Sequence, residues 1–116
     1  MKTERSSLQI IDFEGLEIRD YTAGRDLSSS FAEVLVPAGA RHRLSWSRRS
    51  EKYYLVLEGR LGFSIGGQEV ELGAGDFCVV PKGIRFSYTN TTATTAKVLL
   101  VHTPSFDLEQ EVFEDE

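Results

Sequence analysis

Short apolar segments alternate with glycine- and proline-containing turns along almost the whole chain. Within several segments polar and apolar residues alternate one by one, which is the period of a β-strand with one buried face. Gly66-Gly67 favours a tight hairpin, because two-residue turns of this kind need positive φ. The pattern predicts an all-β, antiparallel sandwich or barrel, with strands at Leu8–Asp12, Leu16–Tyr21, Ser28–Val36, Arg43–Ser47, Lys52–Leu57, Arg60–Ile65, Gln68–Leu72, Phe77–Val80, Ile84–Asn90 and Ala96–Thr103.

The C-terminal segment, residues 105–116, differs from the rest in charge. It carries six of the 18 acidic residues and none of the 13 basic ones, so residues 1–104 have a net charge of 13 − 12 = +1, against −5 for the whole chain. Leu108, Val112 and Phe113 have roughly helical spacing, which predicts one amphipathic turn. We expect this acidic tail either to be disordered or to dock on the folded part.

Length and composition narrow the class of protein. A chain of 116 residues suits one compact domain. No apolar run approaches the ~18 residues that span a membrane, and the N-terminal residues lack a signal-peptide pattern. A single cysteine, Cys78, leaves no internal disulfide and suits a reducing compartment. We therefore expect a cytoplasmic protein that does not bind membranes.

A cluster of basic residues precedes the middle of the chain, but it does not indicate nucleic-acid binding. The rest of the chain is not basic, and no nucleic-acid-binding motif is present. Arginines at a strand end are usually solvated or paired with acids. The cluster comprises Arg41, Arg43, Arg48, Arg49 and Lys52.

Two glycine-anchored segments resemble the two signature motifs of the cupins. In GARHRLSWSRRSEKYYLVLEG the glycines of the first motif fall on Gly39 and Gly59, and those of the second fall on Gly75 and Gly83. Pro81 and Asn90 also match the second motif. The resemblance covers residues 28–106 and implies a jelly-roll β-barrel, the double-stranded β-helix of RmlC-like proteins.

The resemblance also implies a division of the chain. The cupin barrel would be residues 28–104, with the strands of residues 1–27 packing on it and residues 105–116 as the acidic tail, all in one structural domain. Small cupins commonly pair barrel edges, so the resemblance implies a homodimer.

The metal-binding positions of the two motifs are altered in this chain. Cupins usually hold a metal ion through three histidines and one glutamate, and these positions are Ser45, Ser47, Lys52 and Phe86 here. Serine is a poor neutral ligand, lysine is a cation, and phenylalanine offers no donor. We expect no metal and no other cofactor. A site rebuilt from Glu51, His42 and His102 is the alternative, although alternation from Ser45 directs His42 away from the barrel.

The replaced ligands predict a polar pocket instead. In the cupin frame the inward-facing candidates are Arg43, Ser45, Ser47, Lys52, Tyr54, Phe86 and Tyr88. A lysine inside a barrel should find a partner or lose its proton, and Ser45 and Ser47 could accept its hydrogen bonds. These side chains then either hydrogen-bond to one another and leave no room for a ligand, or form a site for an anionic or carbonyl-bearing molecule that pairs with Lys52.

Three functions follow from this pocket. The pattern favours a non-enzymatic, metal-free cupin that binds a small molecule as a sensor, carrier or accessory domain. The first alternative is a metal-independent sugar isomerase or epimerase using His102 with Tyr54 or Tyr88. The second is a metal-dependent cupin with unusual ligands. A Schiff base on Lys52 is chemically possible, but the sequence positions no base beside it.

Overall fold

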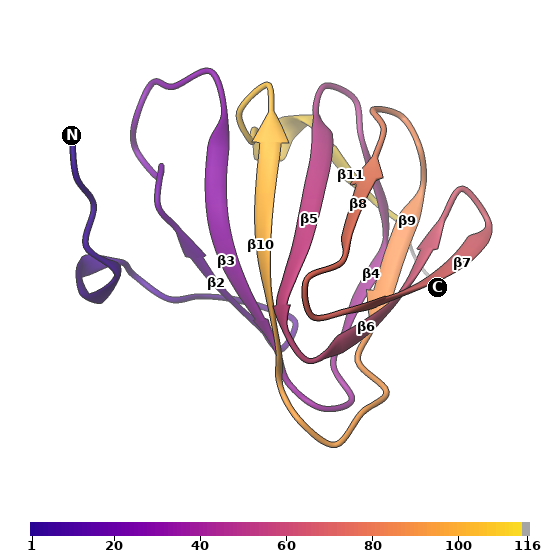
Figure 1. Ribbon diagram of the computed structural model, residues 1–116. Coiled ribbons are helices and arrows are strands. Elements are labelled where there is room, and N and C mark those ends of the chain that lie inside the picture. Colours follow the sequence, from indigo (N-terminus) through magenta and orange to yellow (C-terminus); the bar gives the residue numbers. More distant parts are fainter. Residues whose placement is uncertain (115–116) are drawn as a thin grey trace.

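The computed structural model describes residues 1–114, which form two antiparallel β-sheets facing one another. The six-stranded sheet has the order β1-β2-β3-β10-β5-β8, and the five-stranded sheet has the order β11-β4-β9-β6-β7. In Figure 1, β3, β10, β5 and β8 lie side by side from left to right. The all-β jelly-roll barrel expected from the sequence is confirmed.

Most strands lie close to their predicted positions. Arg60–Ile65, Phe77–Val80 and Ala96–Thr103 have the predicted bounds, and the other strands differ from prediction at one or both ends. The six-stranded sheet comprises β1 (Ile11–Phe13), β2 (Leu16–Asp20), β3 (Ser30–Val36), β10 (Ala96–Thr103), β5 (Glu51–Glu58) and β8 (Phe77–Val80). The five-stranded sheet comprises β11 (Glu111–Phe113), β4 (Arg41–Ser47), β9 (Phe86–Thr89), β6 (Arg60–Ile65) and β7 (Gln68–Gly73).

The helical content of residues 1–114 is limited to two short 3-10 turns, η1 (Arg5–Ser7) and η2 (Leu108–Gln110). Across the same residues, no helix has the length and apolar character needed to cross a bilayer.

One end of the space between the sheets is filled by apolar side chains. Val36, Val56, Phe63 and Val98 are fully buried there, with exposed fractions of 0%. Gly59 closes this end with φ +81°, and a Cβ on it would lie 2.9 Å from the Ala96 Cα. Only glycine fits both the backbone angle and the space, so this turn fixes how β5 leaves the closed end of the barrel.

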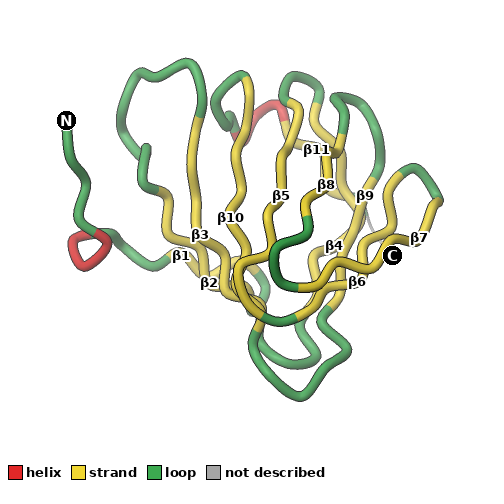
Figure 2. Tube along the Cα trace, viewed as in Figure 1, coloured by secondary structure: helices red, strands yellow, loops and turns green. Residues whose placement is uncertain are grey.

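The C-terminal segment becomes part of the second sheet. Asp107 caps the 3-10 turn η2 by accepting a hydrogen bond from the Glu109 amide. Strand β11 then pairs with β4, with Glu111 opposite Ser47. Figure 2 shows the turn, in red, at the end of the barrel where β10 finishes. The predicted amphipathic turn is therefore wrong for Val112 and Phe113, because strand pairing sets their conformation. Residues 115 and 116 of the predicted tail lie outside the described residues.

Candidate functional site

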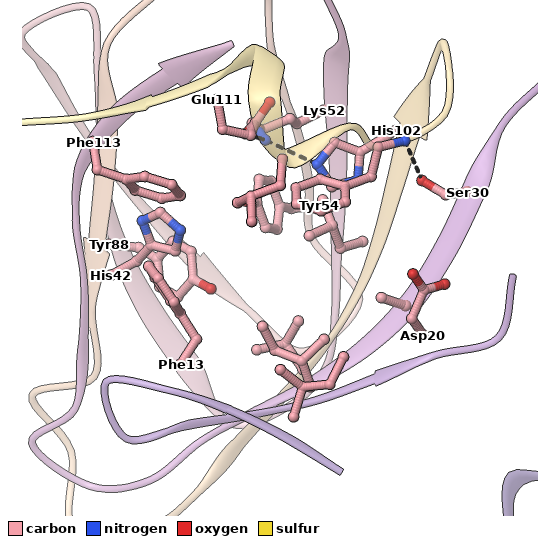
Figure 3. Close-up of a pocket in the computed structure, with 17 residues that line it drawn as sticks. Phe13, Asp20, Ser30, His42, Lys52, Tyr54, Tyr88, His102, Glu111 and Phe113 are labelled. Carbon is pink, nitrogen blue, oxygen red and sulfur yellow. Dashed lines mark hydrogen bonds and ion pairs between the residues drawn. The ribbon is translucent and has the colours of Figure 1, made fainter. Parts of the chain in front are cut away.

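A cavity of about 330 Å³ lies between the sheets at the end opposite the apolar core. Cavities of this size hold small molecules in other proteins. Figure 3 shows its lining, which comes from both sheets and from the C-terminal segment. The lining residues are Ile11, Phe13, Ile18, Asp20, Ser30, Ala32, Val34, His42, Lys52, Tyr54, Tyr88, Leu100, His102, Phe106, Leu108, Glu111 and Phe113.

A buried cluster of three ionisable side chains forms one wall of the cavity. Lys52 on β5 lies opposite His102 on β10 in the sheet register, and its Nζ is 2.8 Å from His102 Nε2. Glu111 on β11 approaches from the other sheet, and its Oε1 accepts a hydrogen bond from Lys52 Nζ. The side chains of Lys52 and Glu111 are only 5% and 3% exposed. The C-terminal strand thus supplies the carboxylate that balances the lysine.

The cluster has a defined protonation pattern. Burial, together with the charge of Lys52, lowers the pKa of His102 to about 3, so its ring is neutral near pH 7. Because Lys52 donates to Nε2, the proton of the neutral ring is assigned to Nδ1. Burial also lowers the pKa of Lys52, while the Glu111 carboxylate opposes this shift. The predicted partners of Lys52, Ser45 and Ser47, are replaced by His102 and Glu111.

His42 enters the cavity because strand β4 is irregular. The register of β4 against β9 shifts between His42 and Ser45, so simple alternation from Ser45 does not hold. The His42 ring stacks on Phe86 at a centroid distance of 5.0 Å and lies 5.1 Å from the Tyr88 ring. The expectation that His42 points away from the barrel is therefore wrong.

The backbone fixes the orientation of the His42 ring. Its Nδ1 lies 2.7 Å from the carbonyl oxygen of Arg43. A carbonyl can only accept, so Nδ1 carries the proton in this contact. In the neutral ring, Nε2 is then the proton-accepting nitrogen. This arrangement suits a general base, since the tautomer is set before any guest binds.

Two phenols lie beside the histidines. Tyr54 and Tyr88 line the cavity, and their rings meet edge to face at 5.6 Å. Both are almost fully buried, and burial raises the pKa of both hydroxyl groups. They are therefore neutral hydrogen-bond donors at physiological pH. The structure brings both predicted tyrosines, Lys52 and His102 together around one cavity.

The remaining predicted pocket residues lie elsewhere. Phe86 is buried behind the lining, where its ring centroid is 5.6 Å from Lys52 Nζ. Ser47 accepts hydrogen bonds from the amides of Arg49 and Ser50. The prediction that Arg43 adds a cation to the pocket is wrong, because its Nε donates to Glu14 Oε1 at 3.0 Å outside the cavity.

The residues at the usual cupin metal positions do not fit a metal ion. Lys52 brings a cation and Phe86 brings no donor atom. Ser45 Oγ is buried and has no hydrogen-bond partner within residues 1–114. Across that part of the chain, no group of three or more His, Cys, Asp or Glu side chains could hold a metal. The rebuilt site through Glu51 is also wrong, because Glu51 is exposed and accepts a hydrogen bond from the Tyr53 hydroxyl.

The fold and cavity define a small jelly-roll barrel with a ligand-sized pocket at one end. The family model of the cupin domain matches residues 32–102. The chain belongs to the cupin family.

Solved structures of similar shape include enzymes. Streptomyces Pac13, described as a nucleoside dehydratase, shares 23% identity at a TM-score of 0.86, over 98% of this chain and 90% of Pac13. A Thermotoga maritima protein described as a predicted oxalate decarboxylase shares 22% identity at a TM-score of 0.78, over 90% of this chain and 99% of that one. At these identities the similarity shows the fold.

Curated relatives match parts of the chain. The HTH-type transcriptional regulator PuuR of Escherichia coli is 35% identical over 57 residues, covering 49% of this chain and 31% of the regulator. An uncharacterized protein of Methanocaldococcus jannaschii is 28% identical over 85 residues, covering 73% of this chain and 68% of that protein. The chain thus spans about a third of the length of PuuR.

Sequence reasoning missed two of the residues that define the site. The sequence pattern places Glu111 in an acidic tail and His42 on the outer face of its strand. The one available signal for Glu111 was the alternation of Glu111, Val112 and Phe113, in which the first and third side chains share a face.

Proposed function

We propose that the cavity binds a neutral small molecule of nucleoside or sugar size, and that its side chains transfer protons to and from that molecule. The proposed reaction class is elimination of water or isomerisation. The observation that carries the proposal is the His42 ring, held by the Arg43 carbonyl with its proton-accepting nitrogen defined, in the wall of a 330 Å³ cavity.

The charges of the lining favour a neutral guest over an anionic one. Lys52, the cation expected to pair with an anion, is already paired with Glu111. Asp20 adds a second carboxylate to the lining, and His102 is neutral. An anion would therefore meet more negative than positive charge. Hydroxyl groups and an aromatic or other flat ring would instead match the phenols and the apolar wall.

The proposed roles follow from the orientation of the His42 ring and from the neutral state of the two phenols. His42 would accept a proton from carbon or oxygen through Nε2. Tyr54 and Tyr88 would donate hydrogen bonds to a leaving hydroxyl or to a developing oxyanion, as neutral phenols can. General acid–base catalysis of this kind contributes about 10²–10⁴-fold to a rate.

The comparison with Pac13 supports this reaction class. Pac13 is described as a nucleoside dehydratase, and its variants with one histidine or either of two tyrosines replaced were determined with uridine. The cavity of this chain contains the same residue types in His42, Tyr54 and Tyr88.

The test combines binding with proton exchange. Nucleosides and sugars, beginning with uridine, would be screened by calorimetry, and bound compounds would be followed by proton NMR in D₂O. We expect a bound compound to exchange a carbon-bound proton or to lose water. His42→Gln should slow this reaction about 10²–10⁴-fold while binding persists. Arg43→Gln, which alters the neighbouring residue outside the cavity, should change the rate little. A rate unaffected by His42→Gln would overturn the assignment.

A binding role without turnover is the second candidate. The partial match to PuuR favours it, because a transcriptional regulator contains a segment 35% identical to this chain. Calorimetric binding with no exchange and no product after long incubation would assign the cavity to sensing or transport.

A further inference from the structure

The Lys52 cluster has an arrangement that proton transfer by His42 and the tyrosines does not need. Its amine is buried, lines the cavity, and is held by two groups that can both accept protons. The cluster therefore places a buried primary amine at the cavity wall, between a carboxylate and a neutral imidazole.

We propose that Lys52 forms a reversible imine with an aldehyde or ketone that enters the cavity. The proposal goes beyond the proposed function, since it concerns a different side chain and does not require turnover.

Two groups beside the amine supply the acid and base that imine formation needs. Glu111 Oε1 already accepts a hydrogen bond from Nζ and would take the ammonium proton. His102 Nε2, 2.8 Å from Nζ, accepts a second N–H and so orients the nitrogen. When the proton facing Glu111 is lost, the lone pair that it leaves on Nζ is the one that attacks the carbonyl carbon.

The second carboxylate oxygen of Glu111 is also consistent with such a role. Oε2 is buried and has no hydrogen-bond partner among residues 1–114. An unpartnered buried acceptor is costly, and a guest hydroxyl or a transferred proton would satisfy it. The lowered pKa of Lys52, caused by burial, helps to make the free amine available.

The reaction balances without any further reactant. The ammonium proton passes to Glu111, and the freed lone pair of Nζ forms a C–N bond as the carbonyl π bond breaks. The carbinolamine oxygen receives one proton from nitrogen and one from Glu111 and leaves as water. The product is the protonated imine on Lys52, and Glu111 is again a carboxylate.

The experiment uses glyceraldehyde as the carbonyl probe and sodium cyanoborohydride to trap the imine as a stable secondary amine. Brief treatment at neutral pH, followed by peptide mass mapping, would give the modification rate at each lysine. Exposed Lys82 is the internal reference for an ordinary amine. We expect Lys52 to be modified at least about tenfold faster than Lys82, because Glu111 is placed to accept its proton and burial lowers its pKa.

Two controls separate the site from general reactivity. The preference for Lys52 should disappear in urea, where the cluster is lost. Glu111→Gln should slow modification of Lys52 by at least about tenfold while leaving Lys82 unchanged. The variant loses the acid that protonates the departing hydroxyl, and this outweighs the further lowering of the Lys52 pKa when the carboxylate is removed. Lys52→Arg keeps a cation for Glu111 but has no primary amine at this position, so only slow modification at the rate of Lys82 should remain. Modification of native Lys52 no faster than Lys82 would overturn the proposal, whether or not the protein turns over any substrate.

Discussion

The two faces of the six-stranded sheet differ sharply at the cavity end. Facing inward, Ser30, His102 and Lys52 lie next to one another on β3, β10 and β5. Facing outward, one residue along each strand, Phe31, Val101 and Tyr53 form the corresponding row. The interior therefore carries the polar groups, and the surface carries the aromatic and aliphatic ones.

This inversion shows which part of the sheet stabilises the fold and which part is available for binding. Further along the same strands, the inward positions become Val36, Val98 and Val56, all buried and apolar. The usual arrangement of an apolar interior thus holds at the closed end of the barrel only. Inward polar residues at the open end line a cavity, while outward apolar residues are left for contact with another surface.

Removing one partner of the Lys52–Glu111 pair should cause the largest loss in the free energy of unfolding. Lys52→Met would leave Glu111 buried without its cation, so the free energy of unfolding should fall by about 3–5 kcal/mol. Adding Glu111→Leu should restore most of this loss, because both charges are then gone. Urea denaturation of the single and double variants would measure both changes.

A surface lysine provides the matched control for that substitution. Lys97 Nζ lies 3.9 Å from Glu33 Oε1, and its side chain is 29% exposed. Lys97→Met should change the free energy of unfolding by less than about 1 kcal/mol. Equal losses for Lys52→Met and Lys97→Met would mean that the inward position has no special electrostatic role.

The buried histidine should make stability depend on pH. The unfolded chain binds a proton on His102 below about pH 6.5, whereas the folded protein keeps this ring neutral down to about pH 3. The unfolded state therefore binds more protons in this window, and the free energy of unfolding should fall as the pH drops through it. The slope is at most about 1.4 kcal/mol per pH unit, measurable by urea denaturation at several pH values.

His102→Gln should flatten this slope between pH 6.5 and 4.5. Glu33 offers a control, because its pKa is lowered, with the Arg5 hydrogen bond as the main cause, from an ordinary value of 4.5. Its stabilisation is present above that value and is lost as the pH falls through the lowered pKa. Glu33→Gln should therefore leave the slope above pH 4.5 unchanged. A slope that persists in His102→Gln would assign the dependence to another group.

The sequence predicted the frame of the barrel and part of its lining. Alternation along a regular strand places Lys52 and Tyr54 on one face, and the structure shows both at the cavity. Glycine and proline turns set the ends of strands such as Phe77–Val80. These features are local, so they can be inferred from neighbouring residues.

Two features of the site depend on non-local pairing and could not be predicted in this way. His42 faces inward only because β4 and β9 shift register between His42 and Ser45, which a period of two does not anticipate. Glu111 reaches Lys52 only because a three-residue strand at the end of the chain pairs with β4. No residue close to Lys52 in sequence indicates that partner.

Substitutions on the outer face of the six-stranded sheet should have the smallest effect on the free energy of unfolding, but they should change self-association. The apolar row continues onto edge strand β8, where Val79 and Phe77 lie beside Tyr53 and Leu55. The Phe77 side chain is 55% exposed, and its ring stacks on Tyr53 at 6.1 Å. We propose that a second copy of the chain covers this face. A continuous apolar row on one sheet can pack against the same row of a second copy related by a two-fold axis.

Phe77→Glu should break that contact without damaging the barrel. Because Phe77 is already exposed, the free energy of unfolding measured at low protein concentration should change by no more than about 0.5 kcal/mol. Sedimentation velocity should show a dimer for the unmodified chain and a monomer for Phe77→Glu. Val70→Glu, on β7 of the other sheet and 39% exposed, should leave the dimer intact. A monomer in all three samples would show that the outer apolar row does not mediate self-association.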